Sequence, residues 1–493
     1  MRLIELMEQN VSQVADREIV GLTADSRQVR PGYLFAALPS SVADGALNGA
    51  DFVPDAVRRG AAAVLGPPGL RAALESSIEV PVIEDREPRR RLALLAARFY
   101  AAQPETIAAV TGTSGKSSVV DFTRQIWMAL GRNGASLGTL GVISAAGERK
   151  LAHTTPDPVV LHGALAELAE LGIDHLALEA SSHGLEQRRL DGVLVKAAAF
   201  TNLSRDHLDY HADEEDYLDA KLRLFDSVMD RGGAAVLPSG GELSDRLATV
   251  CQARGHDILT FGAVGDVHVR QRRVRPDGQQ LTISARDHEG GREGRHEAMI
   301  DLPLIGAFQA ENVLCAIALA IACGEIPDAV LGAAGKLTGV PGRLQSVGGG
   351  IYVDYAHKPE ALRAAITALR PHVGGDGGRL IVVFGCGGDR DRGKRPQMGR
   401  IAAELADRIV VTDDNPRGEE PGSIRREVLA GCPDAVEIGD RAEAIATAIH
   451  WLGAGDILLI AGKGHETGQD IAGVVHPFDD VAVAAEVLRG MSA

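Results

Sequence analysis

The sequence predicts an α/β fold of three domains in which parallel sheets predominate. Short β-branched runs alternate with segments rich in Ala, Leu, Glu and Arg at helical spacing, as is typical of strand–helix units around a parallel sheet. The 493 residues exceed what one hydrophobic core accommodates. Glycine is abundant, at 58 residues, and aromatic side chains make up only 4% of the chain, which favours tight strand-to-helix turns over a β-sandwich.

Three blocks follow from the distribution of strand-like runs. Residues 1–103 form an α/β N-terminal block that contains the Asp25-Ser26-Arg27 motif. Residues 104–342 open with the strand-like run at 106–110 and include an insert near 267–300, where alternating polar and apolar residues predict a more β-rich segment. Residues 343–493 carry apolar runs at 351–354, 380–384, 409–412 and 457–461, which predict a Rossmann-like C-terminal domain.

Charge and composition exclude several classes of protein. The 67 acidic and 51 basic side chains give a formal charge of −16, which repels nucleic acid and anionic lipid. An anionic substrate must then be held by a few placed arginines. The five cysteines show no CxxC spacing, so we expect neither a disulfide framework nor a zinc site. The N-terminus carries acids where a signal peptide is apolar, and no apolar run is long enough for a membrane span. We therefore expect a cytoplasmic protein with no nucleic-acid or membrane partner.

A phosphate-binding loop occupies the start of the central block. The segment Thr111-Gly-Thr-Ser-Gly-Lys-Ser-Ser118 follows an apolar strand and precedes a helix-compatible segment, so backbone N–H groups and a helix N-terminus face the phosphates. Lys116 is expected to reach the terminal phosphates and the Ser117 hydroxyl to ligate Mg²⁺. Val110 stands where the full motif has its first glycine. The loop predicts nucleotide binding without identifying the reaction, because kinases, GTPases, motors and ligases share it.

A second group of chemistry-bearing residues follows the loop. Glu179 ends a buried strand-like run, His207 lies in a polar loop after another apolar stretch, and Lys221 lies on a helix-like segment. Taken singly, the glutamate is structural about as often as functional, the histidine more often solvated or capping, and the lysine usually exposed. In this order after a TGTxGK[ST] loop, and with Pro341-Gly-Arg343 and Asp354-Tyr-Ala-His357 downstream, they resemble the Mur ligase family of ATP-dependent peptide ligases. The resemblance covers nearly the whole chain.

The resemblance implies how nucleotide and metal are held. Two magnesium ions are expected among Ser117, Glu179, His207 and Lys221, the last as an N-carboxylated lysine formed with CO₂. The carbamate supplies anionic oxygens, which Mg²⁺ prefers, where an ammonium supplies none. Lys116, Lys221, Glu179 and His207 are the implied catalytic residues. Asn312 corresponds to a contact to adenine and Asp354 to a residue near the ribose. Ser114 and Gln309 stand where asparagine is common. The remaining implied ATP contacts are Gly112, Thr113, Ser114, Gly115, Lys116, Ser117, Ser118 and Arg343.

The same resemblance assigns the acidic substrate. A muramyl-peptide is expected on Thr154 and Thr155, of the His-Thr-Thr-Pro-Asp segment, with further contacts from Ser181, Gln187 and Arg189. Ser26 matches the uridine-diphosphate pocket. Seen alone, the two threonines read as a turn before proline and the arginine as a solvated side chain.

The third block supplies three loops that follow apolar strands. Because the C-terminal ends of parallel strands meet at one sheet edge, these loops are expected to converge. Gly462-x-Gly464 lacks the third glycine of a dinucleotide fingerprint, and Asp414-Asn-Pro-Arg417 alone reads as a turn. In the resembled family that Asp-Asn-Pro-Arg motif selects meso-diaminopimelate over L-lysine, because an arginine fork pairs with the extra carboxylate. The implied pocket residues are Arg390, Asp414, Asn415, Arg417, Gly462 and Glu466.

The implied reaction joins meso-diaminopimelate to the D-glutamate of UDP-MurNAc-L-Ala-D-Glu through an acyl phosphate, with ATP and Mg²⁺. It belongs to peptidoglycan precursor synthesis, and hence to cell-wall biogenesis, cell shape and cell division. We expect a monomer. Other hypotheses stay open: an L-lysine-adding, folate-polyglutamating or other ligase of the family, a phosphate-loop phosphotransferase or GTPase, and a non-catalytic nucleotide-dependent regulator. The last two leave the motifs outside the phosphate loop without a role.

Overall fold

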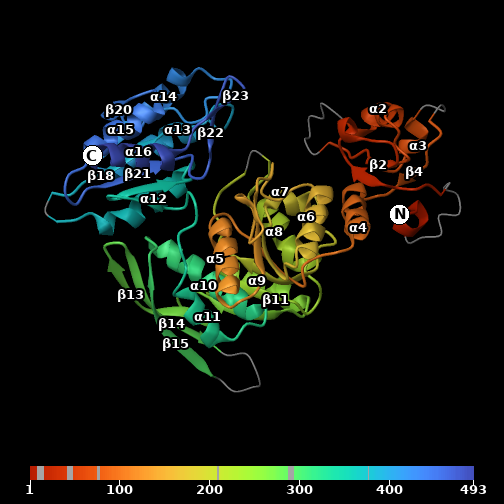
Figure 1. Ribbon diagram of the computed structural model, residues 1–493, viewed down its shortest axis with the longest axis horizontal. Coiled ribbons are helices and arrows are strands. Elements are labelled where there is room, and N and C mark those ends of the chain that lie inside the picture. The colour runs from red at the N-terminus through yellow and green to blue at the C-terminus, as the bar shows by residue number, and fades with distance from the viewer. Residues whose placement is uncertain are drawn as a thin grey trace. The chain divides into compact units, whose positions relative to one another are not determined.

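The computed structural model describes residues 1–7, 16–40, 48–74, 78–207, 210–286, 294–375 and 377–492 (Figure 1). They form two compact units. The first comprises residues 1–116 and 131–259, and the second comprises residues 117–130 and 260–493. Within the described residues, no helix is both long and apolar enough to cross a membrane. The predicted α/β class is confirmed, whereas the domain boundaries at 103 and 342 stay a prediction.

The N-terminal part of the first unit is a small parallel sheet. Its four strands follow chain order: β1 (Gly21–Thr23), β2 (Tyr33–Ala36), β3 (Ala63–Gly66) and β4 (Val82–Glu84). One face packs on α1 (Leu3–Met7) and α4 (Pro88–Tyr100), and the other on α2 (Val53–Arg58) and α3 (Leu70–Ala73). Leu34, Ala36 and Leu65 point to the first face while Phe35 and Val64 point to the second, as strand alternation requires.

The main sheet of the first unit surrounds a fully buried central strand. That strand, β5 (Thr106–Thr111), lies between two parallel neighbours, β9 (His175–Glu179) and β10 (Val195–Phe200). The parallel strands β6 (Gly134–Gly138) and β11 (Ala234–Pro238) extend it on either side, and β7 (Gly141–Ser144) and β8 (Gly147–Arg149) add an antiparallel edge. Because β5, β9 and β10 are parallel neighbours, the phosphate loop, Glu179 and the segment after Phe200 all leave the same edge.

One face of this sheet is covered by helices, one of which carries Lys221. Apolar side chains of the sheet pack against α6 (Pro158–Glu170), α7 (Ser182–Glu186), α8 (Glu214–Arg223) and α9 (Glu242–Ala253) (Figure 1). Asp157 caps the N-terminus of α6 by accepting from Val159 N and Val160 N.

The second unit contains an antiparallel sheet and two helices next to it in sequence. Its strands are β13 (Val267–Arg275), β14 (Gly278–Arg286) and β15 (Arg295–Leu302), which pair antiparallel. The β-rich insert that alternating polarity predicted is thereby confirmed. It packs with α10 (Ala307–Ala322) and α11 (Pro327–Ala334). The helix after the phosphate loop, α5 (Lys116–Ala129), belongs to this unit from Ser117 onward. Gln125 on α5 accepts from Thr338 N at 2.9 Å and donates to Thr338 O at 3.3 Å.

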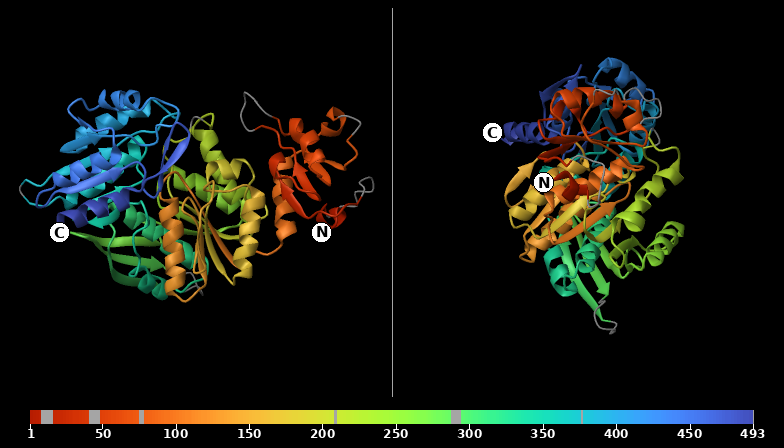
Figure 2. Two further views of the ribbon diagram at one scale, coloured as in Figure 1. Left: turned by 45° about the horizontal axis from the view of Figure 1, so that its top comes forward. Right: turned by 90° about the vertical axis from the view of Figure 1, so that its right-hand side faces the viewer.

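A six-stranded sheet forms the C-terminal part of the second unit. Its order is β16 (Gln345–Gly348), β17 (Ile351–Asp354), β21 (Ile457–Ala461), β18 (Leu380–Phe384), β19 (Arg408–Val411) and β20 (Val436–Glu437), all parallel except β16. One face packs on α12 (Pro359–Leu369), α13 (Lys394–Leu405) and α14 (Pro421–Leu429), and the other on α15 (Arg441–His450) and α16 (Asp480–Ser492) (Figure 2). The Rossmann-like prediction for this block is thereby confirmed.

A buried ion pair joins the two helices on the second face. Arg441, which begins α15, and Asp480, which begins α16, both have fully buried side chains. The guanidinium donates from Nε to Oδ1 and from Nη2 to Oδ2, both at 2.7 Å. A bidentate pair of this kind satisfies both charges, so loss of one partner leaves the other buried and uncompensated.

We expect Asp480→Ala to lower the free energy of unfolding by about 3–5 kcal/mol, because it leaves the Arg441 guanidinium buried without its ion-pair partner. The matched control is Arg363→Ala, which removes the pair with Glu404 in which both side chains are exposed; its effect should stay below about 1 kcal/mol. Denaturant unfolding followed by circular dichroism measures both. Equal effects of the two substitutions would contradict this account of the buried pair.

Candidate functional site

The phosphate loop is held in shape by the segment that follows β10. Gly112 has φ +137°, and a Cβ there would lie 1.9 Å from Thr201 Oγ1, so only glycine fits. Thr201 Oγ1 donates to Ser114 O at 2.7 Å. Asn202 accepts from Ser114 N at 3.0 Å and donates to Ser114 O at 3.0 Å. Ser114, which departs from the more common asparagine, is therefore fixed through its main chain.

Two lysine side chains meet at one carbonyl oxygen of this loop. Lys116 Nζ donates to Gly112 O and to Thr113 O, each at 2.8 Å. Lys221 Nζ, from α8, donates to the same Gly112 oxygen at 2.8 Å and lies 4.2 Å from the centroid of the Tyr217 ring. The Lys221 side chain is buried, with 1% of its surface exposed. The ordinary interpretation of Lys221 as an exposed helix lysine is wrong.

Glu179 joins the predicted metal site to the predicted peptide site. Its Oε1 accepts from Thr139 N at 2.8 Å and its Oε2 from Thr139 Oγ1 at 3.2 Å. Thr139 Oγ1 also lies 3.0 Å from Thr154 Oγ1. Thr155 Oγ1 donates to the main-chain oxygen of Glu179 at 2.8 Å. Both threonines of the Thr-Thr-Pro-Asp segment thus contact, directly or through Thr139, the strand end that carries Glu179.

His207 stands in a group of aromatic side chains. Its φ of +53° is unusual for a residue other than glycine. The ring centroid lies 4.9 Å from that of His183 and 6.2 Å from that of Tyr217, the ring that Lys221 also approaches. In the part of the chain that the structure describes, no three His, Cys, Asp or Glu side chains are grouped as metal ligands. The sequence did not single out His183 or Tyr217, whose placement beside His207 depends on packing.

The predicted peptide-binding residues lie together. Arg189 Nη1 donates to Thr155 O at 2.6 Å, and its Nη2 donates to Gln187 Oε1 at 2.7 Å. Burial lowers the pKa of the Arg189 guanidinium from its usual value. Ser181 N donates to Thr155 Oγ1 at 3.0 Å, while the Ser181 hydroxyl caps α7 by accepting from Gly184 N. Thr154, Thr155, Ser181, Gln187 and Arg189 therefore form one polar strip. Ser26 is buried in the short 3₁₀ turn (Ser26–Gln28) after β1.

Hydrogen bonds connect three of the residues predicted to contact ATP in the second unit: Ser117, Arg343 and Asn312. Arg343 Nη2 donates to Ser117 Oγ at 3.2 Å, and the guanidinium lies 4.9 Å from the Tyr355 ring centroid. Gln309 Nε2 donates to Arg343 O at 3.3 Å, and its Oε1 accepts from Asn312 Nδ2 at 3.1 Å. Gln309 thus connects Asn312 with Arg343. Ser118 is buried on α5.

Asp354, at the end of β17, accepts from Leu344 N at 2.7 Å. Burial raises the pKa of its carboxyl from 3.8 to about 6, against the opposing effect of Arg343. The folded protein therefore holds this proton more tightly than the unfolded chain does. The resulting stabilisation is fully present below pH 3.8 and is lost as the pH rises through about 6.

We expect the stability of the wild-type protein relative to Asp354→Asn to fall by up to about 3 kcal/mol as the pH rises from about 4 to 7. Denaturant unfolding of both proteins at the two pH values measures this difference, in which other titrating groups cancel. A difference that does not change with pH would show that the Asp354 carboxyl titrates as it does in the unfolded chain.

The loops after β18, β19 and β21 leave one edge of the C-terminal sheet, as the apolar runs predicted. Arg417 has φ +51°; its main chain pairs with the β22 (Gly468–Ile471) and β23 (Val474–Pro477) hairpin, through Arg417 N to Asp470 O at 3.0 Å. Its Nη1 donates to Gly388 O at 2.8 Å, in the loop after β18. A Cβ on Gly462, φ +118°, would lie 2.4 Å from Asp414 Oδ2.

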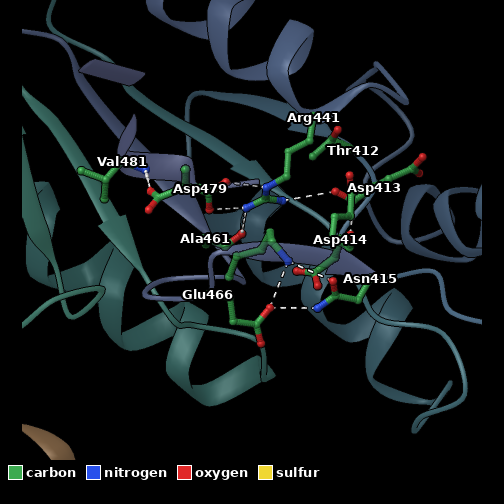
Figure 3. Close-up of polar contacts among 12 residues, drawn as sticks. Thr412, Asp413, Asp414, Asn415, Arg441, Ala461, Glu466, Asp479 and Val481 are labelled. Carbon is green, nitrogen blue, oxygen red and sulfur yellow. Dashed lines mark hydrogen bonds and ion pairs between the residues drawn. The ribbon is translucent and has the colours of Figure 1, made fainter. Parts of the chain in front are cut away.

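A buried cation connects the β19 and β21 loops. Lys463 Nζ donates to Asn415 Oδ1 at 2.9 Å and to Glu466 Oε2 at 3.0 Å (Figure 3). Asp414, Asn415, Arg417, Gly462 and Glu466 are brought together by these contacts, while Arg390 lies exposed in the β18 loop. Sequence reasoning missed Lys463; its place between two glycines of the Gly-Lys-Gly-His-Glu motif was the available signal.

The folds and the loops described above define a phosphate-loop α/β protein with a further Rossmann-like part. Family models agree: the Mur ligase catalytic domain matches residues 18–100, the Mur ligase middle domain residues 110–320, and the Mur ligase glutamate ligase domain residues 342–464. The chain belongs to the Mur ligase family.

Relatives match along the whole chain. A protein of Caulobacter vibrioides is 49% identical over 97% of each chain, and one of Bradyrhizobium diazoefficiens is 50% identical over 96% of each. Both are named UDP-N-acetylmuramoyl-L-alanyl-D-glutamate–2,6-diaminopimelate ligase. A solved structure of a ligase with that name superposes with a TM-score of 0.70 at 32% identity, covering 100% of this chain and 99% of the other.

Proposed function

We propose that this protein is an ATP-dependent ligase that joins meso-diaminopimelate to the D-glutamate of UDP-MurNAc-L-Ala-D-Glu in peptidoglycan precursor synthesis. The observation that carries the proposal is the full-length similarity to ligases of that name, at 49–50% identity. This similarity spans the phosphate loop, the peptide strip and the Asp414–Arg417 loop alike. The place of action is the cytoplasm, the protein acts as a monomer, and its product serves cell-wall growth, cell shape and division.

The reaction needs a leaving group on the acceptor, because a carboxylate does not react with an amine in neutral water. Transfer of the ATP γ-phosphoryl to the D-glutamate γ-carboxylate forms an acyl phosphate and ADP. The diaminopimelate amine then attacks the carbonyl carbon and forms the C–N bond while one of its protons passes to a base. The C–O bond to phosphate breaks, and phosphate leaves with the bonding electron pair. Lys116 offsets charge on the transferring phosphoryl group, and the main-chain N–H groups of residues 112–118 orient the phosphates.

The proposed site can hold magnesium only if Lys221 is carboxylated and not an ammonium. Ser117, Glu179 and His207 offer a hydroxyl, a carboxylate and an imidazole, but Lys221 as an ammonium repels a cation. Addition of the neutral Lys221 amine to CO₂, forming an N–C bond and releasing one proton, gives a carbamate with two anionic oxygens. When bound, Mg²⁺ neutralises charge on the phosphates. The burial of Lys221 beside Gly112 supports this assignment, because it places the side chain to be modified at the phosphate loop.

Each substrate can be assigned to one group of the polar residues described above. Thr154, Thr155, Ser181, Gln187 and Arg189 bind the muramyl-dipeptide, and Ser26 binds its uridine diphosphate. Asn312, Arg343 and Asp354 bind the adenosine of ATP. Arg390, Asp414, Asn415, Arg417, Gly462 and Glu466 bind diaminopimelate. The Arg417 fork can pair with the distal carboxylate, which L-lysine lacks, so lysine leaves the half-buried guanidinium without that partner.

The proposal is tested by phosphate release with ATP and UDP-MurNAc-L-Ala-D-Glu, offering meso-diaminopimelate, L-lysine or no amino acid. Phosphate release that depends on diaminopimelate, with a tripeptide product seen by mass spectrometry, supports the proposal. Equal turnover with L-lysine assigns the chain to a lysine-adding ligase. Release that needs no amino acid favours a phosphate-loop phosphotransferase.

A further inference from the structure

Lys463 is a lysine whose side chain has no exposed surface. It follows β21 in the loop that carries Gly462 and Glu466. A buried ammonium is costly unless hydrogen-bond acceptors and an opposite charge surround it. Lys463 has both: Asn415 Oδ1 lies at 2.9 Å and Glu466 Oε2 at 3.0 Å. Both of these partners belong to the proposed diaminopimelate pocket.

The three side chains form a closed triangle of hydrogen bonds. Asn415 Nδ2 donates to Glu466 Oε2 at 2.9 Å, the same oxygen that accepts from Lys463 (Figure 3). Asn415 Oδ1 also accepts from Asp470 N at 3.0 Å. The amide of Asn415 therefore has one favourable orientation, with its oxygen toward two donors and its nitrogen toward a carboxylate. The Lys463 charge fixes that orientation and offsets the charge of Glu466.

Arg441 donates hydrogen bonds to the main chain next to the same two loops. Its Nη1 donates to Asp413 O at 3.3 Å and its Nη2 to Ala461 O at 3.1 Å (Figure 3). Asp413 directly precedes the Asp414–Arg417 motif, and Ala461 directly precedes Gly462. The guanidinium is itself held by buried Asp480. The two buried cations thus have different roles. Arg441 fixes the main chain of the two loops, and Lys463 fixes the side chains of Asn415 and Glu466.

We propose that Lys463 is a positioning residue for amino-acid recognition, which arranges Asn415 and Glu466 before the incoming diamino acid binds. The inference rests on the proposed function, because it assigns Asn415 and Glu466 to that ligand. A preorganised pocket binds more tightly, because the cost of ordering its side chains is met during folding. The Lys463 charge also reduces the repulsion between Glu466 and a ligand that itself carries carboxylates.

The test is Lys463→Met, which keeps the length of the side chain and removes its charge. Steady-state kinetics of phosphate release should show a rise of about tenfold or more in the KM for diaminopimelate, since each displaced polar contact to a charged group is of that order. The KM values for ATP and for UDP-MurNAc-L-Ala-D-Glu should change by less than about twofold. A lowered Tm with all three KM values unchanged would overturn the proposal and leave Lys463 a structural residue. If Lys463→Met does not fold, the same kinetics are measured for Lys463→Gln, which keeps a hydrogen-bond donor in the site.

The matched control is Arg379→Met. Arg379 pairs with nearly buried Asp456 at 2.6 Å, at the opposite ends of β18 and β21 from the pocket. This substitution removes an ion pair with one buried partner from the same sheet, and all three KM values should stay as in the wild type. A rise in the diaminopimelate KM equal to that of Lys463→Met would show that general loosening of the sheet explains both.

A double-mutant cycle with Glu466→Gln tests whether Lys463 acts by positioning Glu466 or by contacting the ligand itself. If Lys463 acts through Glu466, the rise in diaminopimelate KM caused by Lys463→Met should be smaller in the Glu466→Gln protein than in the wild type. Equal effects in both backgrounds would contradict the proposal. Failure of the proposed function looks different, because the wild-type protein itself would then show no diaminopimelate-dependent phosphate release.

Discussion

Lys221→Ala is expected to reduce ligase turnover by roughly a thousandfold, the order seen when one electrostatic contact to a transferring group is lost. Lys221 is buried, on α8, and its Nζ lies 2.8 Å from the main-chain oxygen of Gly112 in the phosphate loop. Alanine removes both the ammonium and the carbamate that we propose it becomes. Phosphate release with all three substrates measures the loss.

Two further measurements separate the carbamate from a packing role for Lys221. Short carboxylic acids added to Lys221→Ala should restore part of the activity, because they return an anionic oxygen pair to the vacated site. Carbon-13 NMR of the wild-type protein in labelled bicarbonate should show a carbamate signal that the variant lacks. Lys196→Ala, at an exposed position of β10, is the matched control and should keep normal turnover. Near-normal turnover of Lys221→Ala would rule out the carbamate role.

Arg417→Lys is expected to raise the KM for meso-diaminopimelate by about a hundredfold, while the KM for ATP stays within about twofold. Lysine keeps the positive charge but loses the planar fork that pairs with a carboxylate through two hydrogen bonds. The fork is held by Gly388 O, which accepts from Arg417 Nη1 at 2.8 Å. Discrimination against L-lysine should fall in parallel, since selection depends on the distal carboxylate.

The control for this substitution is Arg408→Lys at the start of the same strand, β19. The Arg408 guanidinium lies 3.2 Å from the Trp451 ring centroid, away from the loop that follows Val411. Its replacement should leave both KM values unchanged. If Arg417→Lys raised the KM values for ATP and diaminopimelate equally, the assignment of Arg417 to the amino-acid pocket would be wrong.

Local sequence patterns sufficed for the parts of the fold that are formed within one segment. The apolar run at 106–110, the glycines of the phosphate loop and the helix after them predicted β5, the loop and α5, because each step depends on residues adjacent in the chain. The runs at 380–384, 409–412 and 457–461 likewise predicted β18, β19 and β21. Their parallel arrangement then placed the candidate loops at one edge.

Local sequence patterns could not predict contacts between segments that are distant in the chain. A lysine on an amphipathic helix is ordinarily exposed, yet the Lys221 side chain is buried and donates to the oxygen of Gly112, 109 positions away in the chain. The Arg441–Asp480 pair and the Lys463–Asn415–Glu466 triangle also join residues from different elements. The strands, loops and family motifs of this chain can be predicted from the order of its amino acids, because these features depend on neighbours along the chain. Which charges are buried, and what they hold, becomes visible in the folded protein, since burial of a charge depends on the segments that packing brings around it.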